Sequence, residues 1–159
     1  MNRIPLIDRA HTSPDRKALL DQIHGAFGAT PNMFRAVANS PAALQSMWAA
    51  FGALGSGTLS AKLGEQIAVA VANRNACEYC LAAHTALGRK AGATADEMAA
   101  AQVGSAGDAA TQAALNFALK VVEQRAQVTA DDVQALRSAG FSDEAVMEIL
   151  AHVELNLFT

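Results

Sequence analysis

The sequence predicts an all-α fold. Alanine and leucine dominate its apolar content, and no sustained run of alternating β-branched residues marks a strand. Capping residues recur in front of segments with helical spacing, and glycine or asparagine clusters separate these segments. Together, these observations predict a multi-helix bundle that forms one domain over residues 1–159.

The first three expected helices form an N-terminal layer over about residues 1–55. Ser13-Pro14 and Ser40-Pro41 each place a capping hydroxyl before a proline at the first helical position. Clusters rich in glycine and asparagine should interrupt the chain after the first and after the third of these helices. We expect these helices at residues 14–24, 32–38 and 41–54.

Six further helices are expected in the remainder of the chain. The segment IAVAVA, residues 67–72, resembles a buried strand by itself, but it follows the cap Ser60 and precedes another helical segment, which favours a buried helix. Thr94 has capping-box spacing, and Thr129 and Ser142 precede acidic first turns. The expected helices cover residues 60–73, 77–91, 95–102, 108–126, 130–138 and 143–156.

Composition excludes several classes of function. Hydrophobic residues make up 52% of the chain and charged residues 17%, and the formal net charge is −3 without a Lys/Arg cluster, which argues against nucleic acid. No segment approaches the roughly 20 apolar residues that span a bilayer, and the start of the chain lacks the apolar core of a signal peptide. We therefore expect a cytoplasmic protein with no membrane partner. No phosphate-binding glycine loop is present, and no cofactor is expected.

The stretch CEYCLAAH, residues 77–84, holds both cysteines of the chain. On a helix each residue advances about 100°, so Cys77, Cys80, His84 and Gly88 share one stripe. Apolar neighbours flank this stripe, which indicates that it faces a protected cavity. A lone cysteine pair in a cytoplasmic protein is more often catalytic or metal-binding than structural.

Position favours redox chemistry at this stretch. If Asn75 or Ala76 caps the helix, both thiols lie near its N-terminus, where the pKa of a thiol falls. A thiolate that attacks a peroxide becomes a sulfenic acid, which a second cysteine converts to a disulfide. The helix dipole favours Cys77 as the nucleophile, whereas a histidine one turn after Cys80 favours Cys80. Residue geometry leaves both assignments open.

Two other interpretations compete with a redox site. Two cysteines can fill a helical core without any chemistry. Alternatively, Cys77, Cys80 and His84 could bind zinc, with Glu65 or water as the fourth ligand. No second C-x-x-C or H-x₃-H completes an ordinary structural zinc site.

Glu65 opens the apolar run that precedes the cysteines. It shares a helical stripe with small apolar residues, so it should be partly buried, and a buried carboxylate needs a partner. The simpler alternative is a surface glutamate paired with Lys62.

Glu65, Cys77, Cys80 and His84 together read E-x₁₁-C-x₂-C-x₃-H. This spacing closely resembles the AhpD-like alkylhydroperoxidase branch of the carboxymuconolactone decarboxylase family. The resemblance is specific over about residues 58–92. It extends more loosely to GATPNMFRAVANSPAAL and EILAHVELNLFT.

The resemblance implies an all-helical, self-associating protein, commonly a trimer or a dimer of trimers. It also implies a dithiol peroxidase that acts on organic hydroperoxides and is restored by an external dithiol reductant. By the family pattern, Cys80 is the peroxidatic cysteine and Cys77 resolves it. His84 is the base for Cys80, and Glu65 belongs to the proton relay, acting through water. The family's decarboxylase side is the weaker match, because its members do not depend on this dithiol.

One position departs from the family pattern. The best-known members carry a second histidine two positions after the first cysteine, where this chain has Tyr79. A phenol with an ordinary pKa near 10 donates a hydrogen bond but is a poor base at neutral pH. Tyr79 is therefore either a member of the site or an ordinary packing aromatic.

Other residues that invite a functional assignment have simpler explanations. Trp48 and Phe51 lie three positions apart and should form core or a subunit interface, with an apolar substrate pocket as the alternative. Asn156 matches the family's C-terminal signature without an assigned role. Three histidines lack a partner at motif spacing and should be surface or satisfied core residues: His11, His24 and His152.

Overall fold

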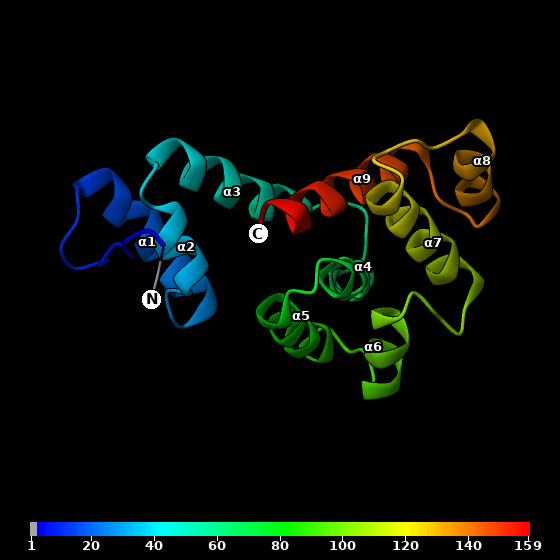
Figure 1. Cartoon of the computed structure of the whole chain (residues 1–159), viewed down its shortest axis with the longest axis horizontal. Helices are drawn as coiled ribbons and strands as arrows, with labels where there is room; N and C mark the ends of the chain where they lie inside the picture. The colour runs from blue at the N-terminus through cyan, green and yellow to red at the C-terminus, as the bar shows by residue number, and fades with distance from the viewer. Residues whose placement is uncertain (1–2) are drawn as a thin grey trace. The chain divides into compact units, whose positions relative to one another are not determined.

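The computed structural model describes residues 3–159, and all regular structure in that range is helical, which confirms the all-α prediction. Within these residues the helices are α1 (Pro14–Phe27), α2 (Asn32–Val37), α3 (Pro41–Leu54), α4 (Ala61–Arg74), α5 (Glu78–Lys90), α6 (Ala95–Gln102), α7 (Ala109–Glu123), α8 (Ala130–Ser138) and α9 (Asp143–Phe158) (Figure 1).

The chain forms two compact units, one up to Ala53 and one from Leu54 onward. The boundary lies near residue 55, where the N-terminal layer is expected to end. The single domain expected over residues 1–159 stays a prediction.

The first unit has its own apolar core. Aromatic rings of its three helices contact one another around Phe34, whose ring centroid lies 5.6 Å from that of Phe51 and 6.0 Å from that of Trp48. The Trp48 indole donates a hydrogen bond to Gln22 at 2.9 Å. Trp48 and Phe51 thus take part in an aromatic cluster inside this unit. Its largest fully buried side chains are Leu20, Ile23, Phe34, Leu44 and Met47.

The second unit is built around α4, which packs against α5, α6, α7 and α9 (Figure 1). All six residues of the segment 67–72 are buried, so this part of α4 is apolar on every side. A helical segment buried all round has no polar face, which explains why its sequence also resembles a strand. Ser60 caps α4, as expected, by accepting a hydrogen bond from the Leu63 amide.

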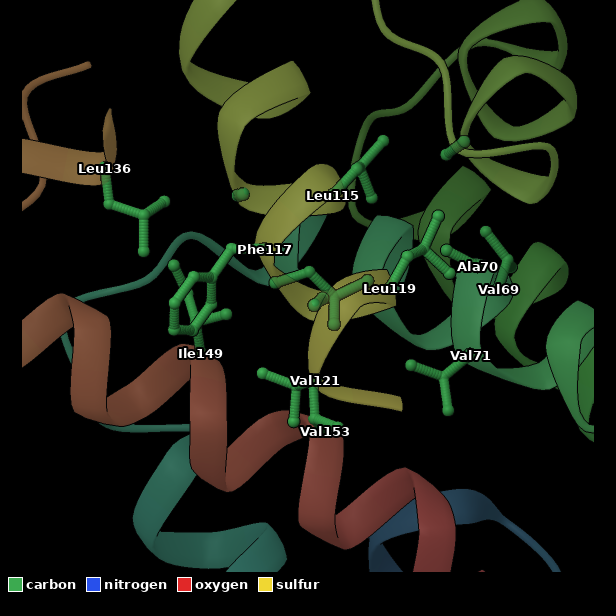
Figure 2. Close-up of a cluster of buried hydrophobic side chains, with 14 of the residues drawn as sticks. Val69, Ala70, Val71, Leu115, Phe117, Leu119, Val121, Leu136, Ile149 and Val153 are labelled. Carbon is green, nitrogen blue, oxygen red and sulfur yellow. The ribbon is translucent and has the colours of Figure 1, made fainter. Parts of the chain in front are cut away.

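Side chains from α4, α6, α7, α8 and α9 form the core of this unit, and Figure 2 shows part of it. Ile149 and Val153 of α9 lie one turn apart and reach towards α7, while Leu136 closes the cluster from α8. This core fixes α4 between α7 and α9. It leaves α5, the helix after the cysteines, on another side of α4.

Several helix ends differ from the expected bounds. Helix α1 runs to Phe27, because Gly28 rather than Gly25 adopts the left-handed conformation, at φ 72°, and donates its amide to the His24 carbonyl. Helix α7 ends at Glu123, before Arg125 and Ala126, which both have positive φ. Helix α9 continues to Phe158.

Within residues 3–159, no helix combines the length and the apolar character that crossing a membrane requires.

Candidate active site

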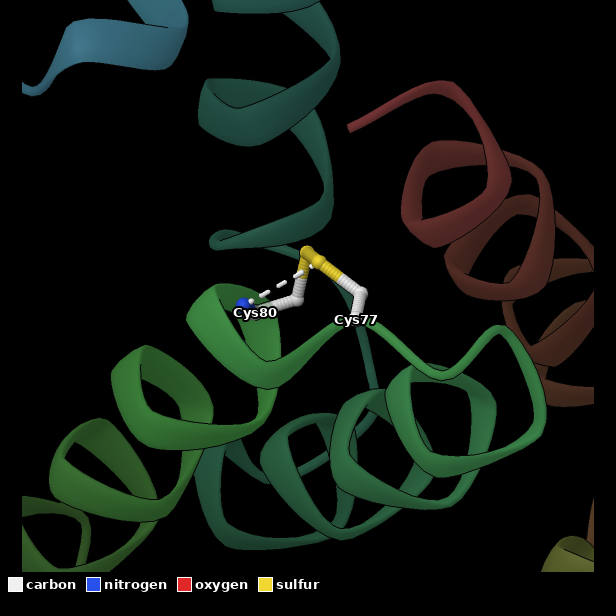
Figure 3. Close-up of a disulfide and its surroundings, with 2 residues drawn as sticks. All are labelled: Cys77 and Cys80. Carbon is white, nitrogen blue, oxygen red and sulfur yellow. Dashed lines mark hydrogen bonds between the residues drawn. A yellow bond between two sulfur atoms is a disulfide. The ribbon is translucent and has the colours of Figure 1, made fainter.

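Cys77 and Cys80 form a disulfide at the start of α5, with their Cα atoms 5.3 Å apart (Figure 3). Cys77 is the N-cap residue, and its sulfur accepts a hydrogen bond from the Cys80 amide at 3.3 Å. This corrects the expectation that Asn75 or Ala76 caps the helix. Asn75 instead ends α4, and Ala76 turns the chain with a positive φ of 51°.

The cap position has chemical consequences for both sulfurs. The amides of the first helical turn and the helix dipole stabilise negative charge at this end of α5. Both cysteines are half-buried, so a small molecule can reach them. A helix N-terminus stabilises a thiolate relative to a cysteine elsewhere in a protein.

His84 and Glu65 form a direct pair beside the disulfide helix. Nδ1 of His84 lies 2.8 Å from Oε2 of Glu65, and their side chains are only 14% and 24% exposed. A carboxylate can only accept, so Nδ1 donates and the lone pair of a neutral His84 lies on Nε2. His84 is one turn after Cys80 on α5, which puts a base on the same stretch of helix as the thiol.

The contact between Glu65 and His84 is direct. The proton relay through water that the family resemblance implies stays a prediction. Lys62 does not pair with Glu65. Its amine donates to Glu97 at 2.5 Å, and Glu97 belongs to the capping box of α6. The alternative of a surface glutamate paired with Lys62 is therefore wrong.

Gly88 explains how α5 comes close enough for this pair. It is buried, and a Cβ at this position would lie 2.5 Å from the Met98 thioether and 3.3 Å from Cβ of Glu65. The missing side chain lets α5 lie against α4 and α6 one turn beyond His84. Gly88 therefore brings the helix of His84 to the helix of Glu65.

Tyr79 occupies the second position of α5 and is 58% exposed. Its phenol lies at the surface, between the two cysteines in sequence, rather than among the buried side chains of the core.

His152 lies beside this site although the sequence gives no motif spacing for it. Its ring covers Gly64, the residue before Glu65, and a Cβ on Gly64 would lie 3.0 Å from its Cε1 atom. Asn156 is buried and donates its side-chain amide to the His152 carbonyl at 2.7 Å. Sequence reasoning missed His152 because its neighbour is 88 positions away, and only the packing of α9 on α4 brings them together.

Glu148 lies one turn before His152 and anchors the loop in front of α4. Its carboxylate accepts hydrogen bonds from the amides of Thr58 and Leu59 and from the Thr58 hydroxyl, at 2.8–3.0 Å. The Thr58 amide lowers the pKa of Glu148 most, and the Leu59 amide contributes in the same direction. A Cβ at Gly57 would lie 2.7 Å from this carboxylate, so a larger residue there would displace the Glu148 side chain from its present position.

Burial lowers the pKa of His152 below its usual value, and the charge of His84 acts in the same direction. Glu148 and Glu65 oppose the shift, because their negative charges favour the protonated ring. The pKa of His152 therefore responds to the charges of Glu65 and His84.

The remaining sequence candidates lie away from this pair of helices in the chain and have local partners. His11 pairs with Asp8, and His24 contacts the Thr30 hydroxyl. Across residues 3–159, no group of three or more His, Cys, Asp or Glu side chains is arranged to hold a metal ion.

Comparison with known proteins gives concordant results. The model of the carboxymuconolactone decarboxylase family matches residues 41–124. A solved structure described as an alkylhydroperoxidase AhpD core, an uncharacterized peroxidase-related protein from Ralstonia eutropha JMP134, is 29% identical. It covers 97% of this chain and 84% of its own, with a TM-score of 0.86.

An uncharacterized peroxidase-related protein from Silicibacter sp. TM1040 is 26% identical, with 98% and 84% coverage and a TM-score of 0.84. The debrominase Bmp8 shares the fold at 18% identity, with 99% and 86% coverage and a TM-score of 0.83. A search of curated proteins found no match.

Proposed function

Because the chain belongs to the carboxymuconolactone decarboxylase family and has an AhpD-like fold, we propose that it is a dithiol peroxidase that reduces organic hydroperoxides. One observation carries the proposal: a Cys77–Cys80 disulfide at a helix N-terminus, one turn from a histidine that a carboxylate orients. Either thiol could attack the peroxide in this geometry. The assignment of Cys80 as the attacking cysteine and Cys77 as the resolving one therefore comes from the family pattern.

In the proposed cycle, Nε2 of His84 takes the proton of the Cys80 thiol. The Cys80 thiolate then attacks the outer oxygen of the hydroperoxide, the O–O bond breaks, and the alkoxide leaves as an alcohol after it receives that proton. Sulfur is oxidised to a sulfenic acid and the peroxide is reduced. Glu65 accepts the Nδ1 hydrogen bond throughout, which stabilises the positive charge that His84 carries between the two proton transfers.

The Cys77 thiol then attacks the sulfenic sulfur of Cys80, and water leaves as the disulfide forms. An external dithiol reduces this disulfide by two exchange steps and becomes a disulfide itself. The protein cycle therefore consumes one hydroperoxide and one dithiol and releases an alcohol and water. We further propose a cytoplasmic setting, where reducing thiols are abundant, and a homo-oligomer, either a trimer or a hexamer.

Turnover of cumene hydroperoxide and tert-butyl hydroperoxide with a panel of dithiol reductants tests this function. Cys80→Ser should lower the rate more than about a hundredfold, and His84→Gln about tenfold to a hundredfold, because general-base catalysis contributes at least that much. Glu65→Gln should lower it about tenfold, since the amide can present the wrong group to Nδ1. Matched controls are Glu123→Gln, an exposed glutamate paired with Arg74, and His11→Gln, and both should keep the wild-type rate.

Mass spectrometry separates the steps. Reduced protein treated with a stoichiometric amount of hydroperoxide should lose two hydrogens as the Cys77–Cys80 disulfide forms, whereas Cys77→Ser should accumulate a sulfenic acid that dimedone traps. Full activity of Cys80→Ser would contradict the assignment of the nucleophile. A disulfide that exchanges with thiols while peroxide is left unreduced would identify a thiol–disulfide exchange protein instead.

A further inference from the structure

Helix α9 places a second imidazole next to the Glu65–His84 pair. The His152 ring lies over the backbone of Gly64, with the three nearest ring atoms 3.0, 3.5 and 3.6 Å from the point that a Cβ would occupy. A Cβ at Gly64 would require the ring to move back by a few tenths of an ångström, so glycine favours this close approach to α4. Because Gly64 directly precedes Glu65, the ring lies within one residue of the carboxylate's own backbone.

Two contacts hold this part of α9. One turn before His152, Glu148 accepts hydrogen bonds from the amides of Thr58 and Leu59, in the loop in front of α4. One turn after it, the buried side chain of Asn156 donates to the His152 carbonyl within α9 itself. Glu148 therefore ties the helix of His152 to the loop that leads into α4.

We propose that His152 is a positioning residue of the Cys80 site, whose protonation draws the Glu65 carboxylate away from His84 and weakens the base. The proposal rests on the proposed function only in taking Cys80 as the thiol that His84 serves. His152 contacts neither the sulfur nor a substrate in this account, and it acts through Glu65.

The charges around His152 set the sign of the effect. Glu148 on its own helix and Glu65 on α4 favour the protonated ring, whereas His84 on α5 and burial oppose it. Burial and the charge of His84 outweigh the two glutamates, so the pKa of His152 lies below its usual value. The ring is therefore neutral at neutral pH. The ring becomes a cation only as the solution turns acidic.

A cation at His152 acts on the pair in two ways. It attracts Glu65, which already gives Oε2 to His84 at 2.8 Å, and so competes with His84 for the carboxylate. It also repels the imidazolium that His84 becomes on accepting the Cys80 proton. Both effects slow thiolate formation, so the reactivity of Cys80 should fall more steeply in acid than titration of Cys80 and His84 alone would cause.

Alkylation of Cys80 by iodoacetamide tests the proposal without any peroxide. In a Cys77→Ser background only one thiol is present, and its alkylation rate is measured between about pH 5 and pH 8.5, the range that brackets an ordinary histidine. Adding His152→Gln should raise the ratio of the rate at about pH 5.5 to that at about pH 7.5 by roughly threefold or more, a change that one removed proton site can produce. His11→Gln in the same background is the matched control and should leave this ratio unchanged. An equal ratio with and without His152 would overturn the proposal.

A second measurement covers the case in which His152→Gln does not fold. The ring protons of His152 are titrated by NMR in the full chain, with and without Glu65→Gln. Loss of the Glu65 charge should lower the His152 midpoint by about 0.5 pH unit or more, since a nearby carboxylate favours the cation. Glu123→Gln should leave the midpoint in place, and an unchanged midpoint in Glu65→Gln would also overturn the proposal.

These measurements distinguish failure of the peroxidase assignment from failure of the role of His152. If hydroperoxides are not reduced but His152→Gln still raises the ratio of the alkylation rates in acid and at neutral pH, the peroxidase assignment fails and the role of His152 stands. If hydroperoxides are reduced and this ratio does not change, only the role of His152 fails.

Discussion

Tyr79 stands where the best-known relatives have a histidine, two residues after the first cysteine. In this chain its side chain is 58% exposed, and a phenol is a weak base at neutral pH. In the proposed cycle, the direct His84–Glu65 contact supplies Cys80 with an oriented base. That cycle needs no second proton acceptor at residue 79 for the thiol to ionise.

Tyr79→Phe should consequently keep the rates of hydroperoxide reduction and of Cys80 alkylation within about twofold of wild type, since an exposed hydroxyl contributes little. Both rates are measured at neutral pH on reduced protein. A tenfold loss in either would instead place the phenol in the proton transfer.

Local chemistry decided which single residues could be predicted. Ser60 and Thr94 were predicted as caps, because an N-cap acts on amides two or three residues away. Cys77 was missed as a cap, because the neighbouring Asn75 is the more usual capping residue. The pairing of Lys62 with Glu97 rather than Glu65 depends on how α6 packs, and the spacing of the two residues along the chain does not reveal it.

Among the helices, the approach of α5 to α4 and α6 depends on Gly88. Its absent side chain leaves just enough room for the Met98 thioether, and Met98 is itself only 2% exposed. A well-packed interior has no spare volume to absorb an extra carbon. The position of His84 relative to Glu65 therefore depends on a glycine that takes no part in chemistry.

Gly88→Ala should destabilise the protein by about 1–2 kcal/mol, because overpacking outweighs the gain of roughly 1 kcal/mol in helix propensity. It should also slow Cys80 alkylation, since α5 must shift away from Glu65. Thermal unfolding and the alkylation rate are the measurements. Gly25→Ala in α1 is the matched control, because a Cβ there meets nothing within 4 Å, and it should be neutral or stabilising. Equal stability of both variants would contradict the role of Gly88.

The anchoring of the α4 loop by Glu148 should show as a pH-dependent stability. The pKa of Glu148 is lower in the folded protein than its usual 4.5, so its contribution is present above that value and lost as pH falls through the lowered one. Glu148→Gln should cost about 1 kcal/mol at neutral pH, after allowance for solvent screening, and almost nothing at about pH 3.

Melting temperatures of wild type and Glu148→Gln between neutral pH and about pH 3 measure this difference. Glu154→Gln, an exposed glutamate on the same helix, is the control and should show no such convergence. A constant difference across the range would mean that Glu148 acts through packing rather than charge.

For the molecule as a whole, the disulfide lies outside the apolar core. The core of the second unit is built from α4, α6, α7, α8 and α9, whereas both cysteines are half-buried at the start of α5. The bridge closes a loop of only a few residues, so it restricts the unfolded chain little. A cysteine pair that cycles between a dithiol and a disulfide requires a fold that stays stable in both states.

Reduction of the bridge should therefore lower the stability by at most about 2 kcal/mol, or a melting-temperature change of a few degrees. Calorimetry of oxidised and reduced protein measures it, and the variant with both cysteines changed to serine should not respond to the reductant. Unfolding of the reduced protein at ordinary temperature would show that the bridge is structural.

The fold class could be predicted from the sequence because caps, breaks and apolar spacing are local signals that agree with one another. Residues that meet only through packing could not be predicted in the same way. His152 approaches Gly64 from the far end of the chain, and Glu148 reaches Thr58 across 90 positions. Glu65 was a candidate because it lies on an apolar stripe, and because its spacing to Cys77 resembles a known family.

The turn between α4 and α5 gives that spacing a geometric meaning. Residues 75–77 reverse the chain between α4 and α5. The number of residues between Glu65 and this turn therefore determines which part of α5 the carboxylate faces. One residue inserted in that span would rotate Glu65 by about 100° and shift it by about 1.5 Å, although every side chain of the site would still be present. The number of residues between Glu65 and Cys77 is thus as important for the site as the residue types. A homologous sequence that keeps all four residues at another count should be read as one that has lost the carboxylate–imidazole contact.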